Sequence, residues 1–254
     1  SMSFTHKNLA ELLKKYNYNI QVGDVITGII FSKEKQGYLV DIGTPIAAYL
    51  PKEEISIFIQ KQTDIEVNLA QEFFILAQDL QKNTIILSTK RLLYIRSWTR
   101  IRQLNTEDIV IQAKITGINK GGLLVELENI QGFIPKSHLC YITKVDTLLN
   151  TTIMCKCLIA NEQSNQLILS NRAAVLEKYL HKLKVGTIVD STVIALKSYG
   201  AFVSIYNIPA LLHISEIEVN KTNNFIIGQI IAVQIIHIDI KQGRLSVSRR
   251  YLKK

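Results

Sequence analysis

Two aromatic residues near the end of the chain have the type and spacing to bind flat, planar groups. Tyr199 and Phe202 lie in an alternating apolar segment around Gly200, and such alternation is typical of a half-buried strand. Residues three apart on a strand face opposite sides, so both rings reach one surface only if the backbone bends between them. Gly200 can supply that bend, because a glycine inside a strand often marks a bulge or a close backbone approach.

Charged residues accompany the two rings. Lys197 precedes them, His213 follows, and Asp239 and Arg244 close the segment. Exposed rings beside positive charge form a stacking platform for the bases of a single-stranded nucleic acid. An isolated aromatic pair in a strand is more often core, and His213 alone could be structural. We interpret these residues as a binding site because they occur together, in the order that a small barrel would bring together.

Composition narrows the class of protein. The chain has 254 residues, enough for one large domain or two to three small ones, and 30 Lys and Arg against 21 Asp and Glu give a net charge of +9. A basic balance fits a polyanionic partner, either a nucleic acid or an anionic membrane surface. No run of about 18 apolar residues is present, so we expect no membrane span.

The sequence predicts no catalytic residue, metal or cofactor. Cys155 and Cys157 lack the two-residue spacing of a zinc knuckle, so we expect no zinc site there. The odd total of three cysteines suggests a reducing compartment. The glycine-rich stretch 116–123 lacks the Gly-Lys-Ser/Thr ending of a phosphate-binding loop. His138 has no orienting acid nearby in the sequence, so we give little weight to a nucleophilic site there.

The chain contains three internal repeats. Gly37, Gly122 and Gly200 are 85 and 78 residues apart, and each follows a similar strand-like segment. A second landmark recurs at 49–51, 133–135 and 211–213, and a Leu-Ser or Val-Ser signature closes each unit at Ser88, Ser170 and Ser248. In the first copy, alternating segments at 25–31, 37–42, 47–50, 72–77 and 84–88 predict short strands, which indicates a small all-β barrel.

The copies differ at the candidate binding positions. The first has Gln36 and Leu39 where the third has its rings, and the second has Gly121 and Leu124. Both have a proline at the place of His213, and proline has no side-chain donor or acceptor. We therefore expect the third barrel to bind by stacking, and the first two to bind by charge or to dock onto protein.

Helical patterns precede the first repeat and join the others. Leucines at three- and four-residue spacing predict a helix within residues 1–21, and Leu176, Leu180 and Leu183 predict another within 171–184. In the linker 91–105 we expect Trp98 to anchor a helix on a barrel. Its arginines either form a solvated face or contact phosphate, since the linker has no acidic residue. These candidates are Arg91, Arg96, Arg100 and Arg102.

The segment 185–250 resembles the S1 RNA-binding repeat, a five-stranded OB-fold barrel. From Phe4 to Arg250 the chain is similar to the short three-repeat form of the ribosomal protein S1 family found in cyanobacteria and plastids. Residues 4–6, 73–76, 98–104, 119–122 and 132–138 carry this wider resemblance. It implies a mainly β fold of three tandem five-stranded OB-fold barrels at 22–90, 106–170 and 185–254, with helical linkers and an N-terminal helix.

The resemblance also implies a function. In that family the positions of Tyr199, Phe202, His213, Asp239 and Arg244 form the RNA-binding face, although this chain has one residue more between Asp239 and Arg244 than the commonest spacing. It implies a non-enzymatic protein of the small ribosomal subunit that binds single-stranded mRNA and helps recruit it for translation initiation, with no membrane or small-molecule substrate.

The Ile, Lys and Asn bias favours the plastid stroma over a bacterial cytoplasm, and the lack of a transit peptide agrees with a chain made inside the organelle. Two alternatives stay open: an RNA-binding accessory subunit of a processing or degradation complex, and a protein-docking adaptor.

Overall fold

The computed structural model describes residues 20–56, 68–79, 83–140, 145–217, 225–250 and 252. The chain divides into two compact units between Ser97 and Trp98. The helix expected within residues 1–21 lies almost wholly outside the described residues, so it stays a prediction.

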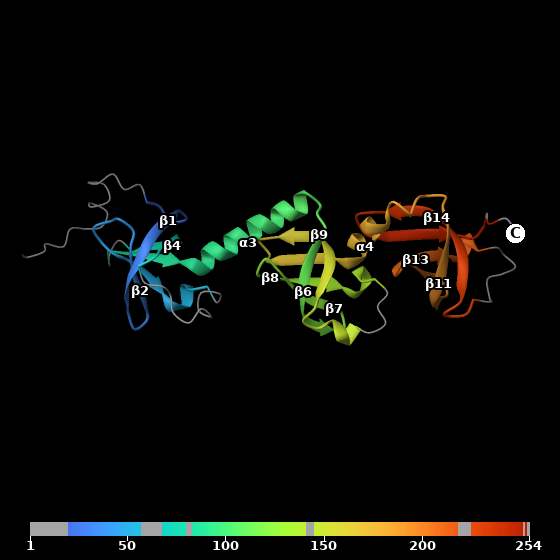
Figure 1. Ribbon diagram of the computed structural model, residues 1–254, viewed down its shortest axis with the longest axis horizontal. Coiled ribbons are helices and arrows are strands. Elements are labelled where there is room, and N and C mark those ends of the chain that lie inside the picture. The colour runs from blue at the N-terminus through green and yellow to red at the C-terminus, as the bar shows by residue number, and fades with distance from the viewer. Residues whose placement is uncertain are drawn as a thin grey trace, which may run out of the picture. The chain divides into compact units, whose positions relative to one another are not determined.

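Three closed five-stranded barrels follow one another along the chain, coloured from blue to red in Figure 1, and this confirms the predicted fold class. The first contains β1 (Val25–Lys33), β2 (Gly37–Asp41), β3 (Ala48–Pro51), β4 (Ala70–Asp79) and β5 (Thr84–Ser88). The second contains β6 (Ile111–Asn119), β7 (Gly122–Leu127), β8 (Ile130–Pro135), β9 (Thr152–Asn161) and β10 (Gln166–Ser170). The third contains β11 (Ile188–Lys197), β12 (Gly200–Ile205), β13 (Ile208–His213), β14 (Ile230–Asp239) and β15 (Arg244–Ser248).

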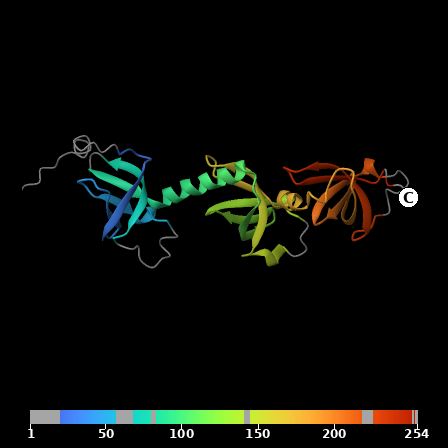
Figure 2. The same ribbon diagram turned by 45° about the horizontal axis from the view of Figure 1, so that its top comes forward.

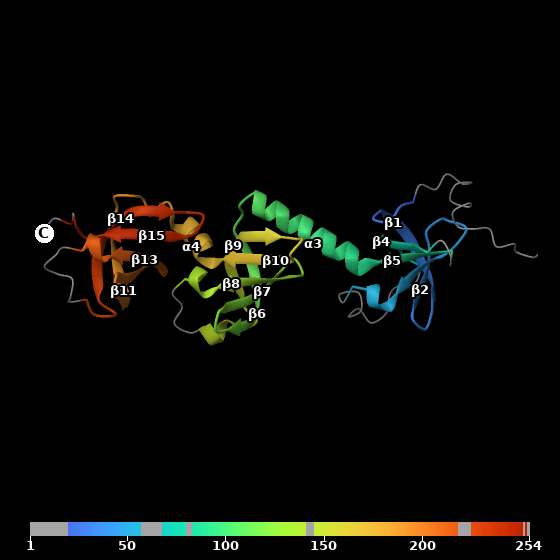
Figure 3. The same cartoon turned by 180° about the vertical axis from the view of Figure 1, so that it is seen from behind.

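All three barrels share one strand order. The first strand pairs with the second and the fourth, and the third strand pairs in parallel with the fifth, which closes the barrel. The turned view in Figure 2 shows the strands wrapping round in each barrel, and Figure 3 shows β5, β10 and β15, the last strand of each, from behind. Short 3-10 helices follow the third strands, at Lys52–Glu54, Lys136–His138 and Ile214–Glu216.

Alternating side chains and repeated bulges explain why these segments close. In β12, Ala201, Val203 and Ile205 are at most 1% exposed and fill the interior, while Phe202 and Ser204 between them are partly exposed. The pairing register shifts once along each first strand. Such bulges add bend and twist, which a five-stranded sheet needs in order to close on itself.

The glycine that begins each second strand lies against the backbone of the third strand. A Cβ built on Gly37, Gly122 or Gly200 would lie 2.4, 2.0 or 2.2 Å from the carbonyl oxygen of Leu50, Ile134 or Leu212. No side chain fits in that space. The recurring glycines, found from sequence alone, thus mark one tight approach per barrel.

A buried serine ends the last strand of each barrel and caps the chain that follows. Ser88 and Ser170 accept hydrogen bonds from the amides of Arg91 and Ala173, three residues on. Ser248 accepts from the amide of Arg250. This explains the repeated Leu-Ser or Val-Ser signature, because the side-chain oxygen satisfies an amide two or three residues on. After Ser88 and Ser170 that amide belongs to the start of a helix, where amides lack partners within the helix.

Two helices follow the first two serines. α3 (Thr89–Thr106) contains Trp98 and Ile101, each 0% exposed. This burial is what an anchor requires, and the packing of Trp98 on a barrel stays a prediction. α4 (Asn171–Tyr179) lies between the second and third barrels. Leu176 of α4 and Leu183 after it belong to the buried core of the third barrel.

The N-terminal end of α4 is fastened to the second barrel by polar contacts. The Asn171 side chain accepts from the amide of Cys140 and donates to the carbonyl of Met154. Lys156, 3% exposed, donates to Asp108 at 2.7 Å and to Glu177 of α4 at 2.5 Å. Burial alone would lower the pKa of Lys156, but the hydrogen bonds and charges of these two carboxylates raise it above its ordinary value. One lysine therefore connects the turn that follows α3 to α4.

Replacing Ser170 with alanine tests the capping role. The hydroxyl caps α4 and also lies 3.0 Å from Nδ1 of buried His138, so we expect Ser170→Ala to lower the free energy of unfolding by about 1–2 kcal/mol. Urea denaturation followed by circular dichroism measures this. Ser164→Ala, in the exposed turn between β9 and β10, is the control. Equal midpoints for the two variants would contradict the capping role.

Candidate nucleic-acid interface

The rings of Tyr199 and Phe202 lie together on the outside of the third barrel. Their centroids are 6.3 Å apart and their planes are nearly perpendicular, at 89°. Tyr199 is 46% exposed, and Phe202 is partly exposed between two buried neighbours. The bend expected at Gly200 is present, with φ at +150°, so the hairpin turns the Tyr199 ring back toward that of Phe202.

Strand register places the other predicted residues on the same outer face. Phe202 pairs with Leu211 on β13, and Leu211 pairs with Ser246 on β15. His213 and Arg244 each lie two residues from one of these partners, so their side chains share the face. They lie toward opposite ends of it, separated by about 13 Å, four residues of strand. The predicted residues therefore form a strip rather than a compact cluster.

His213 is oriented by the turn that follows it. Its Nδ1 accepts a hydrogen bond from the amide of Ser215 at 3.2 Å and lies 2.8 Å from the Ser215 hydroxyl. Because Nδ1 accepts from the amide, the proton of the neutral ring is on Nε2. An exposed His213 thus offers a donor at Nε2 for a phosphate oxygen or a base.

The additional residue between Asp239 and Arg244 is taken up by the turn. Asp239 and Arg244 still pair across β14 and β15, and the Asp239 carboxylate accepts from the amide of Gln242 at 3.0 Å. Within the described residues no ion pair joins Asp239 to Arg244. Asp239 instead shapes the turn that carries Arg244, and its contact with RNA stays a prediction.

α4 supports the same turn from the other side. Arg172 donates to the carbonyl of Gln242 from Nη2 at 3.0 Å and from Nε at 3.3 Å. The backbone of Gly243 lies against that of Ala173. Burial, and then the charge of Arg244, lower the pKa of Arg172. Two arginines thus lie close together at this end of the strip, and sequence patterns gave no sign of the first.

The four linker arginines are less available than the sequence suggested. Arg96 forms an ion pair with Glu72 of β4 at 2.8 Å, and Arg102 forms one with Glu162 of the β9–β10 turn. The linker itself has no acidic residue, as the sequence shows, but these two carboxylates come from a strand and a turn that are distant in sequence. Arg91 lies over the ring of Tyr94, and Arg100 donates to Gln103. Phosphate contact stays a prediction for Arg91 and Arg100.

Sequence comparison missed one aromatic ring in each of the first two barrels. Tyr49 and Phe133 are partly exposed and pair with Leu39 and Leu124, the counterparts of Phe202. They occupy the position that Leu211 has in the third barrel, on the strand next to the one that carries Phe202. The repeated landmarks at 49–51 and 133–135 contain these rings, but only the strand register shows that they share the face of Leu39 and Leu124. The first two barrels therefore each have a ring on this face.

Charge still distinguishes the third barrel. The register equivalents of Arg244 are Thr84 and Gln166, and the counterparts of Lys197 are Glu34 and Asn119. The third barrel combines two rings with exposed Lys197, His213 and Arg244. It is thus the barrel best equipped for stacking and phosphate contact together.

Little else on the described surface offers other chemistry. Burial raises the pKa of Cys140 and of Cys155 to about 12, so both thiols stay protonated near neutral pH. The described residues contain no group of three or more His, Cys, Asp or Glu placed to hold a metal ion. None of the helices in this part of the chain is long and apolar enough to cross a membrane.

Comparison with known proteins agrees with this geometry. A family model described as the S1 RNA binding domain matches residues 19–90, 105–149 and 182–250. Small ribosomal subunit protein bS1c of the red alga Pyropia yezoensis is 44% identical over 98% of this chain and 97% of its own length. Protein bS1 of the cyanobacterium Synechococcus sp. is 36% identical over 99% and 84%. Protein bS1c of Spinacia oleracea is 34% identical over 99% and 63%.

Gly243→Ala tests the contact between the strip and α4. Gly243 has φ at +63°, and a Cβ there would lie 2.5 Å from the amide nitrogen of Ala173. Gly228→Ala is the matched control, because its φ is +91° but nothing lies within 4 Å of its Cβ position. We expect Gly228→Ala to cost about 1–2 kcal/mol of stability from backbone strain, and Gly243→Ala to cost clearly more. Equal losses in thermal unfolding would mean that the contact with α4 is not tight.

Proposed function

Because the chain belongs to the bS1 family of small ribosomal subunit proteins, with three S1 RNA-binding domains, we propose that it binds single-stranded mRNA mainly through the outer strip of its third barrel. Bases stack on Tyr199 and Phe202, while His213 and Arg244 contact phosphates or base edges and Lys197 adds positive charge. Binding by stacking tolerates any base, so sequence selectivity is low.

The observation that carries this proposal is the edge-to-face pair on an exposed face with cationic groups at both ends. A buried pair would be core packing, but Tyr199 exposes 46% of its surface. Proteins bind single-stranded RNA by combining aromatic side chains, on which bases stack, with positive charge along the backbone. The strip supplies both.

The cellular role follows from the relatives. The relatives at 44% identity are plastid bS1c proteins of red algae. They support a role at the small subunit of the plastid ribosome, in delivering mRNA for translation initiation. A bacterial ribosome is the alternative location. The first two barrels, with one ring each, add weaker RNA contacts or dock on the subunit. The role proposed is non-catalytic.

Removing both rings tests the proposal. Each stacked base is worth about 1–3 kcal/mol, so Tyr199→Ala/Phe202→Ala is expected to weaken binding of a labelled, unstructured 12-nucleotide RNA by about thirty-fold or more, as measured by fluorescence anisotropy. Tyr206→Ala is the matched control, since Tyr206 is similarly exposed, at 44%, in the same barrel but stacks on Tyr179. Unchanged affinity of the double variant would overturn the proposal.

A second experiment counts phosphate contacts. For single-stranded RNA the logarithm of the binding constant falls with the logarithm of salt concentration by about 0.7 per phosphate contact. Arg244→Gln is therefore expected to reduce that slope by about 0.7, whereas Arg96→Gln, whose guanidinium is paired with Glu72, leaves it unchanged. Equal slopes for Arg244→Gln and the unmodified chain would exclude a phosphate contact by Arg244.

Two other functions predict different outcomes in the same assays. An accessory subunit of an RNA-degrading complex binds RNA but does not sediment with purified small ribosomal subunits. A protein-docking adaptor sediments with those subunits but does not bind the labelled RNA. The proposed function requires both activities in one chain, with the RNA intact after incubation with Mg²⁺.

A further inference from the structure

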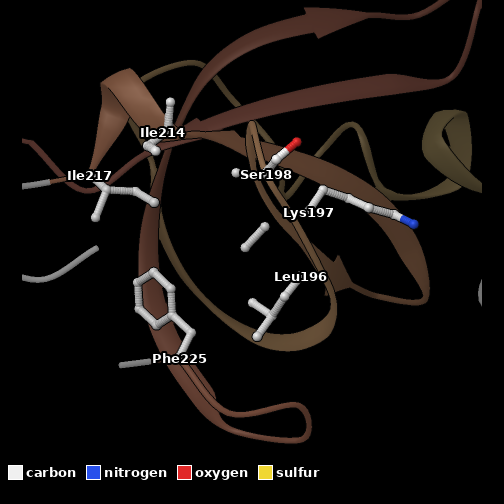
Figure 4. Close-up of a pocket in the computed structure, with 8 residues that line it drawn as sticks. Leu196, Lys197, Ser198, Ile214, Ile217 and Phe225 are labelled. Atoms are coloured by element: carbon white, nitrogen blue, oxygen red, sulfur yellow. The ribbon is translucent and has the colours of Figure 1, made fainter. Parts of the chain in front are cut away.

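A pocket of about 310 Å³ lies at the end of the third barrel, beside the rings. Leu196, Lys197, Ser198, Ile214, Ile217 and Phe225 surround it, as Figure 4 shows. Gly200 and Ala201 also line it. Its size falls at the lower end of the range for sites that hold small organic groups, about 300–1,000 Å³.

Apolar and polar groups both line the pocket, and cations lie at its edge. Leu196 and Ile214 are 47% and 46% exposed, so the wall they form faces solvent. Lys197 extends from the rim in Figure 4, and the guanidinium of Arg249 lies 5.5 Å from the centre of the Phe225 ring. A partly apolar recess with polar groups in its lining and cations at its edge suits a flat group that has apolar faces and polar edges and is attached to an anion. A nucleobase on its sugar-phosphate backbone has that chemistry.

The second barrel has a smaller pocket at the equivalent position. It measures about 220 Å³ and is lined by the counterparts of the same residues, including Ile118, Leu123 and Lys136. Leu123 is the counterpart of Ala201, and Tyr38, 8% exposed, occupies this position in the first barrel. The side chain after the recurring glycine is thus smallest in the third barrel, where the pocket is larger.

The pocket adjoins the stacking surface directly. Tyr199 lies between two residues that line the pocket, Ser198 and Gly200, and its carbonyl accepts a hydrogen bond from the amide of Ile214 at 2.9 Å. A nucleotide next to one stacked on Tyr199 therefore has the pocket within reach. Proteins that bind single-stranded RNA commonly splay out individual bases in this way.

We propose that this pocket receives one unstacked nucleobase of the RNA strand bound along the strip, and that Ala201 keeps it open. The inference rests on the proposed function, and it adds a base-binding subsite that the stacking pair does not provide. A recess of this limited size accepts some base shapes better than others, so it is also where any base preference of this chain arises.

Two variants test the pocket by different routes. Ala201→Leu fills the pocket with a leucine, the residue that the second barrel has at this position (Leu123). Leu196→Ala shortens a solvent-exposed side chain that forms part of the pocket wall. Ile188→Ala is the matched control, since Ile188 is 58% exposed at the other end of the same strand. The whole chain is titrated with the same labelled 12-nucleotide RNA, and its folding is checked by circular dichroism.

We expect each pocket variant to bind RNA about five-fold or more weakly than the unmodified chain, with the salt slope unchanged, because a base contact is lost and no phosphate contact. Ile188→Ala should bind normally. If Ala201→Leu does not fold, Leu196→Ala alone decides.

Other results separate this proposal from the proposed function. If the unmodified chain does not bind RNA, the proposed function itself fails. If it binds and both folded pocket variants bind equally well, the pocket is not a base site. If these two variants bind RNA normally but sediment less with small ribosomal subunits, the pocket instead receives a side chain of a ribosomal protein.

Discussion

The close approach of a glycine to a strand carbonyl is the constraint on which each barrel depends. Gly37, Gly122 and Gly200 each begin a second strand, where a Cβ would lie within 2.4 Å of a carbonyl oxygen. Only glycine permits this contact. In the third barrel the same contact has a functional consequence, because it turns the hairpin so that Tyr199 meets Phe202 on the outer face, and it leaves the pocket lined by Ala201 next to that ring.

Polar contacts then connect the functional strip to the rest of its unit. Ser170 caps α4, Lys156 and Asn171 hold the helix on the second barrel, and Arg172 reaches from it to the turn that carries Arg244. The face of the third barrel that we propose binds RNA is therefore supported from outside that barrel. This arrangement gives a physical reason for the short linker between the second and third barrels.

Much of the fold followed from local sequence signals. Alternating segments, recurring glycines and the closing serines are determined by short-range geometry, and they predicted three small all-β barrels. The pairings of Arg96 with Glu72 and of Arg102 with Glu162 were missed, because each joins residues on different elements. The support of the Gln242 carbonyl by Arg172 was missed for the same reason. Tyr49 and Phe133 were overlooked because a ring on the neighbouring strand reaches the same face as a ring on the expected strand, which becomes clear only from the register.

Photo-crosslinking tests the central claim, that the third barrel is the main RNA platform, most directly. An unstructured RNA containing 4-thiouridine is bound to the full chain, irradiated and digested, and the crosslinked peptides are identified by mass spectrometry. Crosslinks concentrated in residues 196–213 and 237–246, with fewer at Tyr49 and Phe133, are the result we expect. Crosslinks confined to the first two barrels, with the third unmodified, would contradict the account.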